Sequence, residues 1–200
     1  GTRWTVPNAT LQAGAGSITA QGHYTSATHA LEGQATLRAL RPDALHTLLA
    51  AAPLSGRVIA QTQGEAVRFS ADVRADTGTA ARAATTKITA AAGAPLRINT
   101  VSTQGTWQAA DGGTLRLERL LLDALQARVE ATGLQVALGT QSAQGKVTLA
   151  VPGATAQAQG TLAPRSGAGD LQVQWADAAL TQRWLAGLPV AGATVQRALQ

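Results

Sequence analysis

The residues that could do acid–base, nucleophilic or metal chemistry are few and poorly spaced. The three histidines, His23, His29 and His46, lie 6 and 17 residues apart, which is not the spacing of the HExxH metal motif. Ser55 lies in Leu-Ser-Gly and not in the Gly-x-Ser-x-Gly turn that presents a nucleophilic serine. The chain has no cysteine, which excludes thiol catalysis, disulfides and Cys-based metal sites.

The carboxylates do not supply an acid–base couple either. Glu118 and Asp123 come closest, but arginines stand beside them in the sequence. We expect both carboxylates to pair with Arg116 and Arg119. The Gly-Ala-Gly segment at 14–16 is expected to be a turn, because no Gly-Lys-Ser or Gly-Lys-Thr follows it as in a phosphate-binding loop. The sequence therefore predicts a protein that is not an enzyme and that uses no cofactor and no metal.

The charge is spread along the chain. The formal net charge is +5, but basic residues are scattered from Arg3 to Arg197 and acids are interleaved with them. A nucleic-acid surface usually adds aromatic side chains that stack on bases, and only 3% of this chain is aromatic. We interpret the arginines as a solvated face and predict no nucleic-acid partner.

The length and composition favour one domain with an unusual interior. The chain has 200 residues, of which 45% are hydrophobic and 21 are glycine. Small apolar residues each bury little area, which limits an ordinary globular core. No run of 18 apolar residues predicts a membrane-spanning helix, and no basic leader precedes an apolar stretch. We expect an internal segment of a longer protein.

Alternation of apolar and polar residues is the dominant pattern. In 31–39 and 67–75, apolar residues stand at every second position and polar or charged residues stand between them. This period is typical of strands with one buried and one wet face, which favours an antiparallel sheet over a parallel α/β sheet. Breaks with Gly and Pro are expected to be hairpin turns, the clearest being Asp111-Gly112-Gly113.

Two stretches change to helical spacing. The first is 41–52, where Pro42 and Asp43 suit a first turn and leucines follow on one face up to Pro53. The second is 177–188, which ends at Gly187 and Pro189. Helices this short are marginal in water, so we expect both to cover an end or an open face of the sheet.

The dipeptide Gln-Gly recurs in the alternating stretches. It occurs at 21–22, 63–64, 104–105, 144–145 and 159–160, and the first three gaps are 42, 41 and 40 residues. The recurrence favours repeated hairpin-like units over one irregular domain. Trp107, Trp175 and Trp184 could anchor an interior of small residues or contact an apolar ligand, and the two roles are compatible.

Two segments resemble the TamB family. The first is Leu37-Arg38-Ala39-Leu40-Arg41-Pro42-Asp43-Ala44-Leu45 followed by Ala52-Pro53-Leu54-Ser55-Gly56-Arg57-Val58, and it is similar to the family's strand, short helix and next strand. The second runs from Trp175-Ala176-Asp177-Ala178-Ala179-Leu180 to Trp184-Leu185-Ala186-Gly187-Leu188-Pro189. With the strands between them, the resemblance covers most of the chain.

The resemblance implies a fold, a location and partners. TamB is the inner-membrane-anchored subunit of the translocation and assembly module and is related to AsmA-like proteins. The implied fold is mainly β, a repetitive antiparallel sheet curved into an open apolar groove (β-taco-like) with two short amphipathic helices. The implied protein lies in the periplasm of a Gram-negative bacterium and bridges the two membranes. It works with an Omp85-family, TamA-like partner in phospholipid transport and outer-membrane biogenesis.

Under this hypothesis residues 1–200 are one segment of a phospholipid conduit. Such a conduit needs a continuous apolar face, a polar exterior and no charge on its lining, and the alternation supplies all three. The candidate lining residues, which would contact phospholipid acyl chains, are Leu37, Val67, Phe69, Val73, Val129, Val136, Val147, Leu149, Val173 and Trp175. One bulge would reverse the face of every residue after it, so the assignment depends on register.

Two other functions fit the same pattern. A scaffold could bind outer-membrane β-barrel precursors through exposed strand edges. A structural repeat of a surface adhesin would also be free of cysteine and rich in Gly, Thr and Ala, but its interior would be closed and fully packed.

Overall fold

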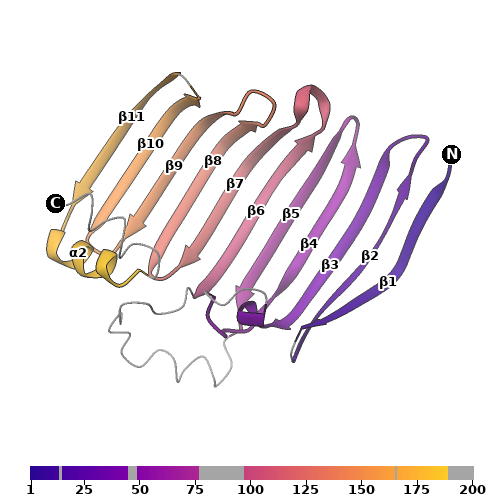
Figure 1. The fold of residues 1–200 in the computed structure, drawn as a ribbon, viewed down its shortest axis with the longest axis horizontal. Helices are drawn as coiled ribbons and strands as arrows, with labels where there is room; N and C mark the ends of the chain where they lie inside the picture. Colours follow the sequence, from indigo (N-terminus) through magenta and orange to yellow (C-terminus); the bar gives the residue numbers. More distant parts are fainter. Residues whose placement is uncertain (14, 45–48, 77–96, 165, 189–200) are drawn as a thin grey trace.

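The chain forms one open antiparallel sheet of eleven strands. The computed structural model describes residues 1–13, 15–44, 49–76, 97–164 and 166–188, and its strands follow one another across the sheet in chain order (Figure 1). The strands are β1 (Arg3–Ala13), β2 (Gly16–Thr25), β3 (Ala30–Leu40), β4 (Leu54–Gln63), β5 (Ala66–Ala75), β6 (Ile98–Gln108), β7 (Thr114–Ala124), β8 (Ala127–Ala137), β9 (Ser142–Val151), β10 (Ala154–Ala163) and β11 (Ser166–Trp175). The sheet is curved and does not close, because β1 and β11 lie at opposite edges (Figure 1). The prediction of a mainly β, antiparallel, curved and open sheet is confirmed.

The register keeps apolar residues on one face even where the alternation slips. Leu117 and Leu120 of β7 are three residues apart, so a strict alternation would put them on opposite faces. The pairing of β6 with β7 shifts by one residue at this point, and both leucines stay on the same face. Shifts between Val6 and Ala9, between Leu37 and Leu40, and between Thr132 and Gln135 act in the same way. Each slip in the sequence is therefore absorbed by a β-bulge.

One α-helix, rather than two, accompanies the sheet in the described part of the chain. The predicted helix at 41–52 is wrong: its described residues form a 3-10 turn, Pro42–Ala44, and residues 49–52 are not helical. Residues 45–48, and with them His46, lie outside the described residues. The chain must reach the start of β4 beside the end of β3, and Pro53 disfavours a helical conformation at the residue before it.

The second predicted helix is confirmed with a slightly shorter span. Helix α2 covers Ala178–Ala186, and Asp177 caps it by accepting a hydrogen bond from the Leu180 amide at 2.9 Å. Figure 1 shows α2 at the strand ends on the β11 side of the sheet. The helix is too short and too polar to cross a membrane, as is every other helix described.

Two hydrogen bonds fix α2 on the turns below it. The Trp184 Nε1 donates to the Leu125 carbonyl in the β7–β8 turn at 2.7 Å, and the Thr181 hydroxyl donates to the Pro152 carbonyl in the β9–β10 turn at 2.8 Å. Gly153 has φ of +81°, and a side chain there would collide with the helix start at Asp177. The helix thus covers an end of the sheet, as its amphipathic pattern predicts.

The sheet has very little interior. Leu40, Leu54 and Ala131 are the only buried hydrophobic residues in the described ranges. Extensive contacts between strands are confined to neighbours in the sheet, so no second layer of described strands covers either face. Large apolar side chains near the edges are exposed, as with Leu171 at 70% and Trp175 at 61%.

The Gln-Gly recurrence marks strand positions but not a structural period. Four of its glycines lie within strands β2, β6, β9 and β10, whereas Gly64 lies in the β4–β5 turn with φ of +63°. The structural unit is the hairpin, repeated across the sheet, and the spacing of about 41 residues corresponds to no equivalent step.

Candidate functional site: the apolar face of the sheet

All ten predicted lining residues lie on the same face of the sheet, which we call the apolar face. Its residues form rows across the strands, because each residue stands opposite its partners on the two neighbouring strands. One row, which we call the leucine row, contains apolar residues on all eleven strands: Leu11, Ile18, Leu37, Gly56, Val73, Val101, Leu122, Val129, Leu149, Ala156 and Val173. It includes five of the ten predicted positions.

A second complete row is rich in alanine. This alanine row consists of Ala9, Ala20, Ala35, Val58, Ala71, Thr103, Leu120, Ala131, Val147, Ala158 and Leu171. Thr103 is its only polar member, and its hydroxyl donates to the Arg119 carbonyl at 3.2 Å. Val147 is the predicted lining residue of this row.

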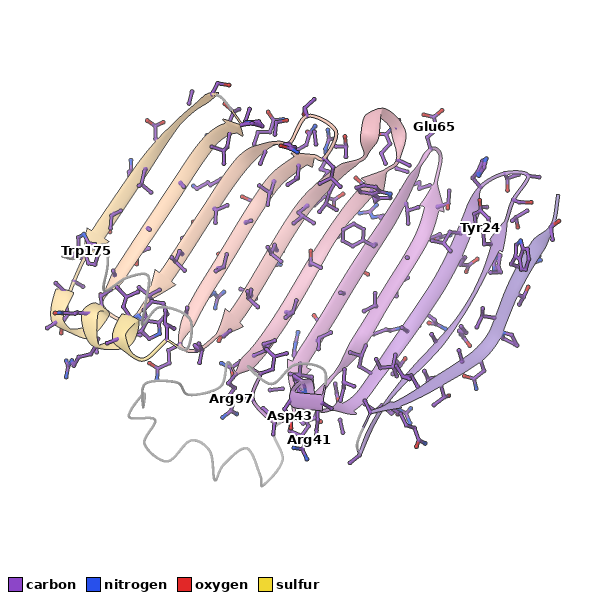
Figure 2. All side chains as sticks on the ribbon, viewed as in Figure 1. Tyr24, Arg41, Asp43, Glu65, Arg97 and Trp175 are labelled. Atoms are coloured by element: carbon purple, nitrogen blue, oxygen red, sulfur yellow. The ribbon has the colours of Figure 1, made fainter. Side chains whose placement is uncertain are left out.

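Glycine dominates the next row. This glycine row runs through Val6, Gly22, Gly33, Ala60, Phe69, Gly105, Leu117 and Leu134, and continues with Gly145, Gly160 and Gly169. The outer row beyond it, the tryptophan row, holds Trp4, Tyr24, Leu31, Thr62, Val67, Trp107, Leu115, Val136, Ala143, Leu162 and Gly167. Trp175 lies on the same face at the opposite strand ends, opposite Ala154 (Figure 2). No charged residue occurs in any of the four rows.

The other face carries the charges. Across it lie the ion pairs Arg68–Glu118 at 3.4 Å and Arg128–Glu130 at 2.6 Å. The prediction that Glu118 and Asp123 pair with Arg116 and Arg119 is wrong. Glu118 instead meets Arg68, two strands away across β6, and Asp123 accepts a hydrogen bond from the Asn99 amide at 2.8 Å.

Several hollows among the described residues are lined mainly from this polar face, and one of them also takes in Ala143 and Leu162 of the tryptophan row. The shallow hollows around Ile59, for example, are lined by Gln34, Arg57, Gln61 and Ser70. The apolar face is therefore a broad open surface, whereas the polar face contains hollows lined by side chains that can form hydrogen bonds.

Aromatic residues on the apolar face have two different roles. The Phe69 ring lies over Gly105 on the next strand, and the Trp107 ring occupies the space beside Gly113 where a side chain would otherwise be. Trp184 is held by the hydrogen bond to Leu125. These three pack against the protein, whereas Trp175 stands exposed at the β11 edge (Figure 2).

The two described histidines have polar partners near the β2–β3 turn. The His23 Nε2 lies 3.7 Å from a Glu32 carboxylate oxygen, and the His29 Nδ1 is hydrogen-bonded to the Tyr24 hydroxyl at 3.0 Å.

A line of bulges and glycines across the strands is the feature that the sequence pattern did not predict. Between the glycine row and the alanine row, β1, β7 and β8 each carry a bulge, and β2, β3, β6, β9, β10 and β11 each place a glycine in the glycine row. Bulges and glycines are the two usual devices for bending a strand. We call this line the crease; it crosses nine of the eleven strands and lacks such a device only on β4 and β5.

The crease requires glycine for steric reasons at all of its glycine positions except Gly33. A methyl group added at Gly145 would lie 2.7 Å from the Leu134 Cα, and one at Gly160 would lie 2.5 Å from the Gly169 Cα. The Gln-Gly dipeptides and the interruptions of the apolar–polar alternation are visible in the sequence. Only the register of the strands shows that they lie on one line across the sheet.

No protein-family model, curated protein or solved structure matches this chain.

Proposed function

We propose that this chain is a segment of a TamB-like periplasmic protein that bridges inner and outer membranes, and that its apolar face conducts phospholipid between them. The observation that carries the proposal is the set of four apolar rows, which cross all eleven strands with no charged side chain. Through the whole protein the segment supports outer-membrane biogenesis with an Omp85-family, TamA-like partner.

The chemistry of the face favours hydrocarbon over polypeptide. A peptide lying on it would need partners for its backbone N–H and C=O groups, because leaving such groups unpaired away from water is costly. The polar side-chain groups in the four apolar rows are those of Trp4, Tyr24, Thr62, Thr103 and Trp107. The three hydroxyl groups among them already have hydrogen-bond partners. An acyl chain has no group to satisfy.

The dimensions of the face suit a lipid. Strands of 10 or 11 residues span about 35 Å, whereas the hydrocarbon of one bilayer leaflet is about 15 Å deep. The open edges at β1 and β11 let the apolar face continue into further strands, as a conduit between two membranes requires.

Site-specific photo-crosslinking in the full-length protein in cells tests the proposal. A photoreactive residue is placed at Val147 or Val73 on the apolar face. The matched control positions are Thr148, beside Val147, and Asp72, beside Val73. Their side chains point to the polar face. We expect phospholipid adducts at the first pair and none at the second.

Two outcomes would contradict the proposal. One is the absence of phospholipid adducts at several apolar-face positions, and the other is equal labelling of both faces. Adducts of outer-membrane protein precursors at the apolar positions would replace the lipid by a polypeptide cargo.

The free edges favour a second candidate, a scaffold for β-barrel precursors. All ten residues of β11 are exposed, and one side of its backbone has no partner strand in the described structure. Such an edge can pair with an incoming strand. This candidate predicts precursor adducts at β1 and β11 rather than in the central rows. The closed, packed interior of an adhesin repeat is not favoured, because the described sheet is open.

A further inference from the structure

The two edges of the sheet differ in how well they resist pairing with another strand. β1 carries Pro7 inside the register shift between Val6 and Ala9, and Arg3 begins the strand. A proline, a bulge and a charge are features that protect an edge strand from pairing. β11 has no proline and no bulge, pairs with β10 without interruption, and holds one charged residue, Asp170. β11 is therefore the edge that is open to another strand.

The apolar face of β11 has large side chains at one end and none at the other. Leu171, Val173 and Trp175 are 70%, 42% and 61% exposed. Toward the start of the strand, the same face carries only Gly167 and Gly169. An antiparallel copy of β11 would bring the large end of each strand beside the small end of the other.

The helix that follows β11 leads away from this edge. The hydrogen bonds from Thr181 to Pro152 and from Trp184 to Leu125 hold α2 beside the β9–β10 and β7–β8 turns (Figure 1). The helix therefore returns along the strand ends toward the middle of the sheet. Within the described residues, no strand pairs with the outer side of β11.

We infer that β11 pairs with β11 of a second copy of this chain, antiparallel and about a twofold axis at Leu171. In this register Leu171 stands opposite its counterpart, Val173 of each copy opposite Gly169 of the other, and Trp175 opposite Gly167. The axis is normal to the sheet, so the two apolar faces lie on the same side and join into one surface. The inference does not depend on what that surface carries.

The sheet already contains a contact of the kind that this register creates. Within the chain, Phe69 stands opposite Gly105, and its ring lies 3.1 Å from the position that a methyl group at Gly105 would take. An aromatic ring over a glycine of the neighbouring strand covers backbone that the glycine leaves open. Trp175 and Gly167 would repeat this arrangement across the twofold axis.

Charge selects this register over its nearest alternative. With the apolar faces on one side, the longest overlap is nine residues of β11, and it is reached only with the axis at Leu171 or at Asp170. An axis at Asp170 would place two carboxylates opposite each other, and like charges in that position are destabilising. With the axis at Leu171, each Asp170 stands opposite Gln172, whose amide can donate to it.

Single cysteines test the register, because the chain has none of its own. Cysteines at directly opposite positions are within reach of a disulfide, whereas positions displaced by two residues are too far apart. In the purified chain under mild oxidation, we expect Leu171→Cys to form a covalent dimer and Asp170→Cys to stay monomeric on a denaturing gel. Leu11→Cys, at an exposed leucine of β1, is the control for random collision and is also expected to stay monomeric.

A charge on the twofold axis tests the association without a covalent bond. Leu171→Lys sets two like charges opposite each other, whereas Leu11→Lys adds the same charge at the other edge. In sedimentation equilibrium we expect a dimer whose dissociation constant rises about tenfold or more in Leu171→Lys and is unchanged in Leu11→Lys. Circular dichroism checks that both variants fold.

Several outcomes would overturn the inference. One is a chain that is monomeric at every concentration, and another is equal crosslinking of Leu171→Cys and Leu11→Cys. A disulfide between these two variants when they are mixed would place β1 on the β11 edge, and a covalent dimer of Asp170→Cys would move the axis. Equal weakening by the two lysine variants would show that the copies associate through their apolar faces instead. If Leu171→Lys does not fold, the cysteine pattern decides the question alone.

Discussion

At the scale of single residues, the glycines of the crease set the shape of the sheet. A methyl group at Gly105 would collide with the Arg116 carbonyl oxygen and would lie 3.1 Å from the Phe69 ring. At Gly33 the same addition meets its nearest atom at 3.6 Å, an ordinary contact. The same residue type is therefore obligatory at one position of the row and replaceable at another.

We predict that Gly105→Ala lowers the free energy of unfolding by about 1–3 kcal/mol, because backbone and ring must both shift to admit the methyl group. Gly33→Ala is the control and is expected to be neutral or slightly stabilising, since Ala has the smaller entropy cost in a strand. Urea unfolding of both variants measures the difference. Equal effects would show that the crease does not depend on close backbone approach.

The turn after β3 contains the ion pair between Arg41 and Asp43. Arg41 donates two hydrogen bonds to the Asp43 carboxylate, at 2.6 and 3.1 Å, and these lower the pKa of Asp43 from its ordinary value. Figure 2 shows both residues at one end of the sheet. Both side chains lie at the surface, so solvent screens the pair.

We predict that Arg41→Gln raises the pKa of Asp43 toward its ordinary value of about 3.9. Because the folded pKa is depressed, any stabilisation by the pair is present above the unfolded pKa and is lost as the pH falls through the folded pKa. Titration of the Asp43 side-chain carbon by NMR measures the change. Arg183→Gln on α2 is the control, and an unchanged Asp43 titration in Arg41→Gln would contradict the assignment.

At the scale of elements, turns and α2 hold the strand ends together. Leu125 and Gln126 connect β7 to β8 with φ of +51° and +65°, the left-handed conformation of a type I′ turn. Neither residue favours that conformation, so the turn carries a conformational cost. The Leu125 carbonyl accepts the Trp184 indole hydrogen bond, which ties the turn to the helix.

We predict that Gln126→Gly raises the free energy of unfolding by about 1 kcal/mol, because glycine adopts a positive φ without steric cost. Glu65→Gly in the β4–β5 turn is the matched control, since Glu65 does not have a positive φ and gains nothing. Thermal unfolding compares the two. A stabilising effect of Glu65→Gly equal to that of Gln126→Gly would refute the explanation.

The helix contributes through a buried hydroxyl. Thr181 is only 3% exposed, and its hydroxyl donates to the Pro152 carbonyl. We predict that Thr181→Val, which preserves shape, costs about 1–3 kcal/mol because the partly buried Pro152 carbonyl loses its donor. Thr161→Val on the exposed polar face of β10 is expected to change stability by much less, and denaturant unfolding distinguishes the two. Loss of Pro152 contact in the Val variant should also loosen the β9–β10 turn in hydrogen exchange.

At the scale of the whole molecule, the eleven described strands form a one-dimensional stack, and no second layer of strands covers them within the described residues. Each strand makes extensive contacts only with its sheet neighbours, so stability is close to a sum of neighbouring-strand terms, as in repeat proteins. The edge strands have one neighbour and the central strands have two. The molecule is therefore expected to open from its edges.

We predict that amide hydrogen exchange is slowest in β6–β8 and at least about tenfold faster in β1 and β11. Mass spectrometry on peptides from each strand gives the profile. Uniform protection across the eleven strands would show instead that the sheet unfolds as one cooperative unit.

The sequence by itself determined the strand character and the two faces. Alternation at period two placed Leu37, Val73, Val147 and the other predicted lining residues on one face, because side chains of a strand point alternately to opposite sides. Helical spacing over 177–188 and the glycine at 187 similarly marked α2, since helix ends depend on local hydrogen bonds. The helix that the sequence pattern predicts at 41–52 is absent from the described residues of that stretch, because the path of the chain from β3 to β4 overrides the local helical pattern.

Only the tertiary structure decided which residues of different strands lie beside one another. The pairing of β6 with β7 places Leu117 and Leu120 on one face despite the bulge between them. The order of the strands brings Glu118 close to Arg68, and the register of all strands aligns the bulges and glycines along the crease. None of these is a local property, because each depends on which residue of a neighbouring strand stands opposite. The physical reason is that a sheet is held together by contacts between neighbouring strands. A shift of one residue in the pairing of a strand would move all of its side chains to the opposite face.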